Sequence, residues 1–362
     1  MRIGLVTFHC SYNFGSALQT WALKHQLESM GHVVQVVDYR GRDFDQYKLL
    51  HFDSPKALAS SLAFCGRNLR RSRAFESFIR EQFNCTERYG VSDENRMGEL
   101  ASRFDCVVCG SDQIWNLDCT QGPVAPFFLA FAGPLRRVAY APSLSHISFR
   151  QENFDAKAQE RIASWLSRFS AISVREAATV SLFQRLTDIP IQTCIDPTLL
   201  LDADDYVSIT KGNAIESGSL FVYVLENNPT LITYAGQVAR EMDIPIAYAS
   251  KRTVDFGVPA TNYYGIGPSE FLALVQKSAA VLTNSFHATV FSLLFEVPFQ
   301  TFSTVKSGSR MKELLENLDA ARHFTDGLHI ETPVASPLSS ITPKLATLRA
   351  DSLAFLNQAL GD

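Results

Sequence analysis

The chain of 362 residues is long enough for two domains that each bury a hydrophobic core. Apolar residues make up 46% and charged residues 19%, which excludes a disordered or collagen-like polypeptide. Lysine and arginine total 33 against 37 acidic residues, a net charge of -4, so the composition lacks the basic excess of a nucleic-acid-binding protein.

The N-terminal sequence MRIGLVTFHC contains an apolar run that is too short for a secretory signal, and no small-residue cleavage pattern follows it. No stretch of the chain approaches the roughly 18–20 apolar residues needed to cross a bilayer. These patterns predict a cytoplasmic protein.

Strand-like and helix-like segments alternate through the first half of the chain. Residues 2–8 predict a buried strand, a polar turn and an amphipathic helix follow, and residues 33–39 predict the next strand. Continuously apolar strands joined by a helix are typical of a parallel βαβ unit. Further apolar runs that end in polar turns predict strands at 106–110, 138–143, 171–174 and 192–196.

A second series of the same kind begins near residue 219. It contains the strand-like runs LFVYVLE, IPIAYAS and AAVLTNS, with helical patterns at 231–242 and 269–277. Two such series predict an α/β fold with two doubly wound parallel-sheet, Rossmann-like domains in a GT-B-like arrangement. We expect domains at 1–203 and 204–335, a hinge at 202–206, and a C-terminal helix within 336–362 that packs back across the domains.

The seven cysteines are scattered, which does not indicate a disulfide framework. Cys106 and Cys109 form a CxxC motif, but they lie in a predicted strand, where positions three apart point to opposite faces. Their sulfurs would not converge on one ion. We therefore predict no metal site.

Four arginines occur in the segment RNLRRSR at 67–73. The pattern favours a solvated helix face, and the alternative is contact with phosphates or with an anionic membrane surface at the inner face of the membrane.

Polar turns follow the predicted strands at the ends where parallel α/β sheets bind ligands, outside the carboxyl ends of the strands. These turns read SYNFGS, GSDQIWN, VRE, DPT and NSFH in chain order. They are therefore the candidate binding residues of the chain.

The turn NSFH stands where a buried strand leads into a buried helix. Asn284 or Ser285 can cap that helix, whose free N–H groups and positive dipole end suit a phosphate or carboxylate. His287 would then lie in the first helical turn, beside the anion. The alternative is that Asn284 and Ser285 are only caps and that His287 only packs.

Three cations are further candidates for binding an anion. Lys306 and Arg310 lie on a loop that enters another helix, and each alone reads as a surface residue. Arg175 directly follows a buried strand, although pairing with Glu176 or another nearby acid is the structural alternative.

Common catalytic motifs are missing from the chain. It contains no GxGxxG, no GxxxxGK[ST], no GxSxG and no HExxH. These absences argue against the usual dehydrogenase, kinase and hydrolase assignments.

Taken together, the motifs resemble those of the polysaccharide pyruvyl transferase family. The resemblance runs from about residue 1 to residue 318 and is carried, in the family's order, by TFHCSYNFGSALQTWAL, VVCGSDQIWN, YAPSLS, SVREAATV, IDPTLLL, NSFHATVFSLLFEVPF and SGSRMKELL. It implies transfer of pyruvate from phosphoenolpyruvate onto two hydroxyls of a sugar, which forms a cyclic ketal and releases phosphate. The implied partners are phosphoenolpyruvate, as co-substrate without a cofactor, and a saccharide acceptor of the kind that is often lipid-linked.

The resemblance also implies roles for individual residues. It places donor contacts at Arg175, His287 and Arg310. Some members carry Arg-Leu-His where this chain has Ser285, Phe286 and His287, so we expect Lys306 or Arg310 to supply the missing charge.

The expected mechanism uses His287 as a general acid toward the methylene carbon of phosphoenolpyruvate. Asp112 is expected to accept a proton from a sugar hydroxyl, and the N-terminal domain to bind the sugar. The expected donor-binding residues are Arg175, Asn284, Ser285, Lys306 and Arg310, and the expected acceptor-binding residues are Asn13, Gln19, Gln113 and Trp115.

Structural alternatives exist for several of these residues. Gln19 would merely decorate its helix, Trp115 would be core, and Asp112 would cap the following turn. His9 is expected to be structural. Two functional alternatives also remain: a GT-B glycosyltransferase with a nucleotide-sugar donor, and a non-catalytic sugar-binding relative.

Overall fold

The computed structural model describes residues 1–50, 54–144, 153–211, 215–304, 308–327, 332–334 and 338–361. The chain forms two compact units. The first unit comprises residues 1–47, 79–201 and 347–362, and the second unit comprises residues 48–78 and 202–346.

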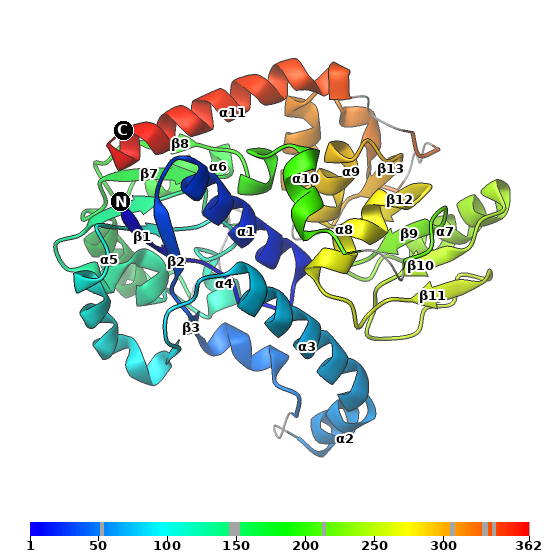
Figure 1. Cartoon of the computed structure of the whole chain (residues 1–362), viewed down its shortest axis with the longest axis horizontal. Coiled ribbons are helices and arrows are strands. Elements are labelled where there is room, and N and C mark those ends of the chain that lie inside the picture. Colours follow the sequence, from blue (N-terminus) through cyan, green and yellow to red (C-terminus); the bar gives the residue numbers. More distant parts are fainter. Residues whose placement is uncertain are drawn as a thin grey trace. The chain divides into compact units, whose positions relative to one another are not determined.

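The first unit contains a six-stranded sheet in the order β2-β1-β5-β6-β7-β8, and every neighbouring pair is parallel (Figure 1). All six strands were predicted. Because β1 and β5 are neighbours while β2 lies on the other side of β1, the direction of winding reverses between β1 and β5. The strands are β1 (Arg2–Val6), β2 (Val33–Val36), β5 (Cys106–Cys109), β6 (Arg136–Ala139), β7 (Ala171–Val174) and β8 (Ile191–Thr193).

Helix α1 (Phe14–Ser29) connects β1 to β2, as expected. Asn13 caps it, since its side chain accepts hydrogen bonds from the backbone N–H groups of Gly15 and Ser16. The other helices of this unit are η1 (Arg42–Tyr47), η2 (Val91–Ser102), α4 (Leu117–Thr120), η3 (Ala125–Phe128), η4 (Ala130–Ala132), α5 (Ala156–Leu166), α6 (Ala177–Phe183) and η5 (Pro197–Leu199), and β3 (Tyr39–Arg40) pairs with β4 (Tyr89–Gly90).

The second unit contains a six-stranded sheet in the order β11-β10-β9-β12-β13-β14, again parallel throughout. Its winding reverses between β9 and β12, so the NSFH turn that follows β12 lies at a topological switch point. The sequence analysis missed β11 and β14, which have three and two residues, and also β13, which has four. The strands are β9 (Leu220–Tyr223), β10 (Ile246–Tyr248), β11 (Ala260–Asn262), β12 (Ala280–Thr283), β13 (Phe299–Phe302) and β14 (Phe324–Thr325).

The helices of the second unit include the two that the apolar spacing predicted, α7 (Pro229–Met242) and α8 (Pro268–Gln276). The expected hinge at 202–206 falls in η6, directly after the change of unit, and its role as a hinge stays a prediction. The remaining helices are α2 (Pro55–Ala63), the first part of α3 (Cys65–Gln82), η6 (Ala203–Ile209), α9 (Phe286–Leu294), α10 (Gly308–Asn317) and η7 (Ala321–His323).

Residues 48–78 belong to the second unit, whereas we had placed them in the N-terminal domain. Close packing of α3 on the loop after β11 explains this. The Nη1 group of Arg71 donates to the carbonyl oxygen of Tyr264 at 3.0 Å, and its guanidinium lies 4.9 Å from the Tyr264 ring centroid. A Cβ atom on Gly265 would meet Cδ of Arg70 at 2.7 Å, so the helix rests directly on glycine backbone.

Helix α11 (Leu338–Leu360) contains the predicted C-terminal helix. Its residues up to Ala346 belong to the second unit, and the rest belong to the first unit. Within the first unit, the Arg349 guanidinium donates two hydrogen bonds of 2.6 Å, to the carbonyl oxygens of Leu199 and Leu201. These bonds fix the helix to the segment that leaves β8.

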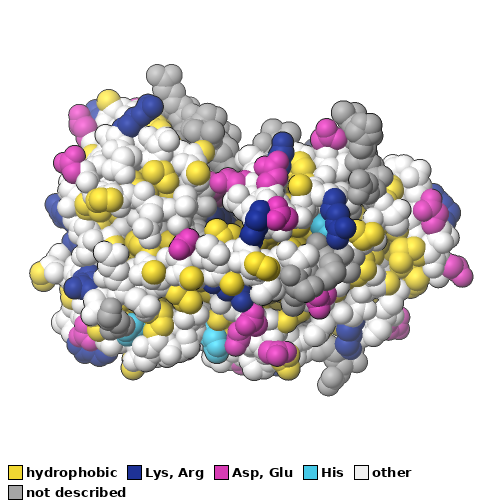
Figure 2. All heavy atoms as spheres, turned by 90° about the horizontal axis from the view of Figure 1, so that it is seen from above, with side chains coloured by type: hydrophobic (Ala, Val, Ile, Leu, Met, Phe, Trp, Pro, Cys, Tyr) yellow, Lys and Arg dark blue, Asp and Glu magenta, His cyan; other side chains and the backbone are white. Residues whose placement is uncertain are grey.

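The expected fold class is confirmed: the protein is α/β, with two doubly wound parallel sheets of the Rossmann-like kind from which GT-B enzymes are built. On the face shown in Figure 2, basic and acidic side chains are interspersed, in keeping with the small net charge. Among the helices of the described residues, none combines the length and apolar composition that crossing a membrane requires.

We predict that Arg349→Met lowers the free energy of unfolding by about 1.5–3 kcal/mol, because it removes charged hydrogen bonds to two carbonyl groups. Urea denaturation measures this change. Lys344→Met is the matched control on the same helix, since Lys344 forms only an exposed ion pair with Asp319, and it should change stability by less than about 1 kcal/mol. Equal effects of the two substitutions would contradict the proposed anchoring of α11.

Candidate active site

The turn after β12 is held by the side chain of Asn284. Its Oδ1 accepts from the backbone N–H of Leu225 at 2.7 Å, and its Nδ2 donates to the carbonyl oxygen of Glu226 at 2.7 Å. The residue is fully buried. This corrects our expectation that Asn284 contacts the donor, because its amide joins the loops after the neighbouring strands β9 and β12.

Ser285 is the N-cap of α9, as one of the two interpretations expected. Its hydroxyl accepts from the backbone N–H of Ala288 at 3.4 Å, a long hydrogen bond. The Thr289 hydroxyl donates to the Ser285 carbonyl oxygen at 3.0 Å and shares a 2.8 Å hydrogen bond with the Thr301 hydroxyl on β13. The start of α9 is therefore fixed to the sheet by buried hydroxyl groups.

His287 and Arg310 both lie against the ring of Phe286. The His287 imidazole is half-buried, and its centroid is 5.2 Å from that of Phe286 in an edge-to-face arrangement. The Arg310 guanidinium carbon lies 5.6 Å from the same ring centroid, and this arginine is buried, with 7% of its surface exposed. The fold thus brings together two of the three donor residues implied by the resemblance, at the positive end of α9. Lys306, the other expected cation, lies outside the described residues.

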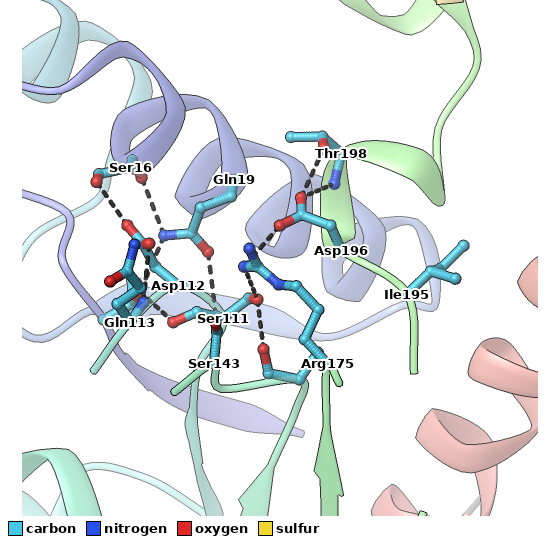
Figure 3. A network of polar contacts seen from close by, with 12 residues as sticks. Ser16, Gln19, Ser111, Asp112, Gln113, Ser143, Arg175, Ile195, Asp196 and Thr198 are labelled. Carbon is cyan, nitrogen blue, oxygen red and sulfur yellow. Dashed lines mark hydrogen bonds and ion pairs between the residues drawn. The ribbon is translucent and has the colours of Figure 1, made fainter. Parts of the chain in front are cut away.

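Arg175 is buried inside the first unit and paired there. Its Nη2 lies 2.6 Å from Oδ2 of Asp196 and donates to the Ser111 hydroxyl at 2.5 Å (Figure 3). The side chains of Arg175 and Asp196 are 5% and 0% exposed. This matches the structural alternative, with Asp196 as the acid in place of Glu176, and the expected contact of Arg175 with the donor stays a prediction.

Gln19 is also part of this internal network. Its Oε1 accepts from the backbone N–H of Ser111 at 3.0 Å, and its Nε2 donates to the Thr7 hydroxyl at 2.9 Å (Figure 3). The side chain is fully buried. Gln19 therefore positions the strand ends, and the expected acceptor contact is corrected. Gly110 precedes this turn with φ +118°, and a Cβ atom there would lie 2.0 Å from the Tyr140 carbonyl oxygen.

Asp112 lies at the N-terminus of α1. Its Oδ2 accepts from the Ser16 hydroxyl at 2.5 Å, and its Oδ1 accepts from the backbone N–H of Gln113 at 2.8 Å. A carboxylate thus occupies the positive end of this helix, which makes that end unfavourable for another anion. The expected catalytic role of Asp112 stays a prediction.

Trp115 is a core residue. It is 0% exposed, stacks on Phe128 and Phe183 with centroid separations of 5.0 and 5.2 Å, and donates from Nε1 to the Phe127 carbonyl oxygen at 3.0 Å. The expectation that it forms a platform for the sugar is therefore wrong.

Asn13 and Gln113, the other expected acceptor residues, are half-buried. Asn13 is engaged as the cap of α1, and Gln113 Oε1 accepts from Nδ2 of Asn116 at 2.9 Å. Their contact with the acceptor stays a prediction.

The sequence analysis treated His9 as structural and did not pair it with Asp38. His9 is fully buried, with Nε2 3.1 Å from Oδ1 of Asp38 and Nδ1 3.2 Å from the Thr7 carbonyl oxygen. Burial alone would raise the pKa of Asp38, but hydrogen bonds from His9 and Arg40 hold it well below its usual range. These contacts join the ends of β1 and β2.

Asp43, in η1, is a further residue that sequence reasoning missed. Burial raises the pKa of its carboxyl group to about 6, against the opposing effects of its own backbone hydrogen bond and of the nearby His9. Its carboxyl folds back over Gly41, where a Cβ atom would lie 2.6 Å from Oδ1. A carboxyl group that titrates near neutrality is a candidate functional group.

The CxxC cysteines are both buried in β5. Burial raises the pKa of Cys106 to about 12 and that of Cys109 well above its usual value. Both are therefore neutral thiols in the core at physiological pH.

The arginine-rich segment lies on α3 in the second unit. Arg67, Arg70 and Arg73 are exposed, which agrees with a solvated helix face, while Arg71 lies between the rings of Phe75 and Tyr264. Contact of this face with an anionic membrane surface stays a prediction.

Two doubly wound sheets, each with polar residues beyond the carboxyl ends of its strands, define an α/β protein of the two-Rossmann-domain class. A family model described as polysaccharide pyruvyl transferase matches residues 13–304. The chain belongs to this family. Membership makes it a transferase of the polysaccharide pyruvylation class, with a saccharide as acceptor.

Comparison with curated proteins finds no match. Comparison with solved structures finds matches over nearly the whole chain at 10–12% identity. UDP-N-acetylglucosamine 2-epimerase from Rickettsia bellii has a TM-score of 0.48 at 10% identity and covers 99% of this chain and 96% of its own. Os79 from O. sativa, in complex with UDP, has a TM-score of 0.47 at 10% identity and covers 99% and 95%. ADP-heptose lps heptosyltransferase II from E. coli has a TM-score of 0.41 at 12% identity and covers 99% of each chain.

We predict that Arg175→Met destabilises the protein by about 3–5 kcal/mol, because it leaves the Asp196 carboxylate buried without its charge partner. Adding Asp196→Asn should recover part of this loss. Urea denaturation tests both, with Arg96→Met, which breaks an exposed ion pair with Asp93, as control. A loss below about 1 kcal/mol for Arg175→Met would contradict the buried pairing.

We predict that Asp43→Asn stabilises the protein at about pH 7.5, by at most about 3 kcal/mol. The pKa of Asp43 is higher in the folded than in the unfolded state, so its ionisation lowers stability as the pH rises from about 4 to about 7. The gain should therefore shrink toward about pH 4. Unfolding free energies across this range test it, with Asp188→Asn, an exposed aspartate in the loop before β8, as control; a gain that does not depend on pH would contradict the assignment.

Proposed function

We propose that the protein transfers pyruvate from phosphoenolpyruvate to two hydroxyls of a saccharide in a polysaccharide or glycolipid precursor, forming a cyclic ketal and releasing phosphate. Membership of the polysaccharide pyruvyl transferase family supports a pyruvyl transfer. The observation that carries the proposal is the placement of His287 and Arg310 on the same Phe286 ring at the start of α9.

The donor in this proposal is held by the second unit. Phosphoenolpyruvate carries a phosphate and a carboxylate, and the start of α9 offers backbone N–H groups with the positive end of the helix dipole. Arg310 adds a guanidinium that can hold either anion through two parallel hydrogen bonds. The first turn of α9 contains no acidic residue that would compete with the donor.

The proton that the reaction needs comes from His287 in this mechanism. Protonation of the donor's methylene carbon makes a methyl group and leaves positive character at the central carbon. One sugar hydroxyl attacks that carbon and loses its proton, and the carbon–oxygen bond to phosphate then breaks.

Closure of the ketal completes the balance of the reaction. The second hydroxyl attacks the same carbon as phosphate departs, and it also loses its proton. Two protons are thus released from the hydroxyls, one is consumed by the methylene carbon, and the other leaves with phosphate. Arg310 stabilises the negative charge on the departing phosphate.

We predict that His287→Gln lowers the rate of pyruvyl transfer by about 10² to 10⁴, because a positioned general acid contributes this much. The measurement follows phosphate release from phosphoenolpyruvate across a panel of saccharide acceptors, with product mass as the second readout. His25→Gln is the matched control, since His25 is half-buried and stacks on Trp21 in the first unit.

The same assay separates the alternatives. An undiminished rate in the His287→Gln variant would overturn the assignment of the acid. Thermal stabilisation of the wild-type protein by nucleotide sugars, but not by phosphoenolpyruvate, would overturn the proposed donor; a ligand at 100 times its Kd should stabilise by about 2.7 kcal/mol.

A further inference from the structure

Three aromatic side chains of the first unit form a small cluster at the carboxyl end of β1. The ring centroids of Tyr12 and Phe44 are 5.7 Å apart, those of Tyr12 and Tyr47 are 5.2 Å apart, and those of Phe44 and Tyr47 are 5.8 Å apart. Each ring therefore contacts both others. We call these three residues the aromatic cluster.

The position of the cluster is that of a ligand site in this type of fold. Tyr12 lies in the loop between β1 and α1, next to the α1 cap Asn13, and the other two rings lie on η1. Helix α4 packs against η1, and the turn with Asp112 and Gln113 directly precedes α4. The cluster thus stands beside the switch point between β1 and β5, where doubly wound sheets bind ligands.

The aromatic cluster is distinct from the hydrophobic core of the unit. The core aromatics Trp115 and Phe127 are 0% and 1% exposed, whereas all three residues of the aromatic cluster are half-buried. None of the three is among the residues of the core cluster that contains Trp115. The other residues of η1 are charged or polar, so a contribution to the core does not explain the aromatic side chains.

The Phe44 ring of the cluster packs against the buried side chain of Arg40. The Arg40 guanidinium carbon lies 4.7 Å from the Phe44 ring centroid, and its Nε donates to Oδ1 of Asp38 at 2.9 Å. The Arg40 side chain is only 8% exposed. Since Asp38 also pairs with the buried His9, this ring rests on a rigid support, as pre-organised binding surfaces require.

The charges around the cluster favour an uncharged, hydroxyl-rich ligand. Asp43 and Asp45 flank Phe44 in the chain, while Arg42 and Lys48 stand at the two ends of the same segment, so the charges balance and favour neither an anionic nor a cationic ligand. A carboxylate accepts hydrogen bonds from hydroxyl groups, and the C–H face of a sugar ring packs well on an aromatic ring. This chemistry differs from that at the start of α9, where the cations lie.

We propose that the aromatic cluster is the subsite on which a neutral sugar ring of the acceptor saccharide stacks, with Asp43 accepting hydrogen bonds from its hydroxyls. The proposal rests on the proposed function in that it names the residues that hold the acceptor. The sequence analysis expected Trp115 and Gln19 to bind the acceptor, but both are buried. The proposed subsite consists instead of three aromatic residues that were not among the expected acceptor residues.

The test measures sugar binding directly, without donor or turnover. Saturation-transfer NMR is recorded on the wild-type protein with the methyl glycosides of glucose, galactose, mannose and N-acetylglucosamine. We compare Tyr12→Leu and Tyr47→Leu, which keep apolar bulk but remove the flat ring. Trp165→Leu is the matched control, because Trp165 is half-buried but packs against the hydrophobic core through Phe128.

We expect saturation transfer to the C–H protons of at least one glycoside in the wild-type and Trp165→Leu proteins. Its affinity should fall about tenfold or more in each tyrosine variant. Thermal unfolding of every variant confirms that it is folded. Absence of binding by all four glycosides in the wild-type protein, or equal binding by the folded tyrosine variants, would overturn the subsite.

Failure of this proposal and failure of the proposed function give different results. If the subsite is wrong but the function is right, phosphoenolpyruvate-dependent ketal formation persists in the tyrosine variants with an unchanged acceptor KM. If the function is wrong but the subsite is right, no phosphate is released with any acceptor. Glycosides still bind to the wild-type protein, and the tyrosine variants still bind them more weakly.

Discussion

The buried ion pair between Arg175 and Asp196 is the constraint on which the functional end of the first unit depends. It joins the residues that follow β7 and β8, and through the Ser111 hydroxyl it also reaches the turn after β5. Two charges inside a protein persist only when they compensate each other, so neither residue is available to a ligand without a large cost. Within the first unit this pair therefore serves the fold, and a contact of Arg175 with the donor stays a prediction.

The two units differ in the charged residues that lie at the positive ends of helices α1 and α9. In the first unit, Asn13 caps the backbone N–H groups at the start of α1, and the Asp112 carboxylate accepts from the Ser16 hydroxyl in the first turn. In the second unit, the first turn of α9 has no acidic residue, and His287 and Arg310 lie beside it. The electrostatics therefore suit an anionic ligand at α9 and a neutral one near α1. These are the chemical characters of a phosphorylated donor and a sugar acceptor.

The success of the sequence analysis followed the strength of each local signal. Buried parallel strands are continuous apolar runs, so all six strands of the first sheet were found, whereas the two- and three-residue strands β11 and β14 have no such signal. The polar turns of the sequence do follow strands β1, β5, β7, β8 and β12. Their side-chain directions could not be predicted, because Gln19, Asn284 and Arg175 use their polar atoms on backbone and side-chain partners far away in the sequence.

The sequence contains a pattern that could have predicted the aromatic cluster, but the sequence analysis did not use it. Phe44 and Tyr47 alternate with charged and polar residues in the segment RDFDQY, directly after a predicted strand. Trp115 drew attention because tryptophan offers the largest ring, yet its indole is enclosed by Phe128 and Phe183. Whether an aromatic ring meets solvent depends on neighbours that are remote in the chain.

The sequence by itself determined the two doubly wound sheets, the family and the positions of the polar turns, because apolar periodicity and short motifs are local properties of the chain. Only the tertiary structure decided which polar side chains in those turns serve the fold. Hydrogen bonds and ion pairs in the interior join residues that are distant in sequence, and each buried polar atom must find such a partner before any ligand does.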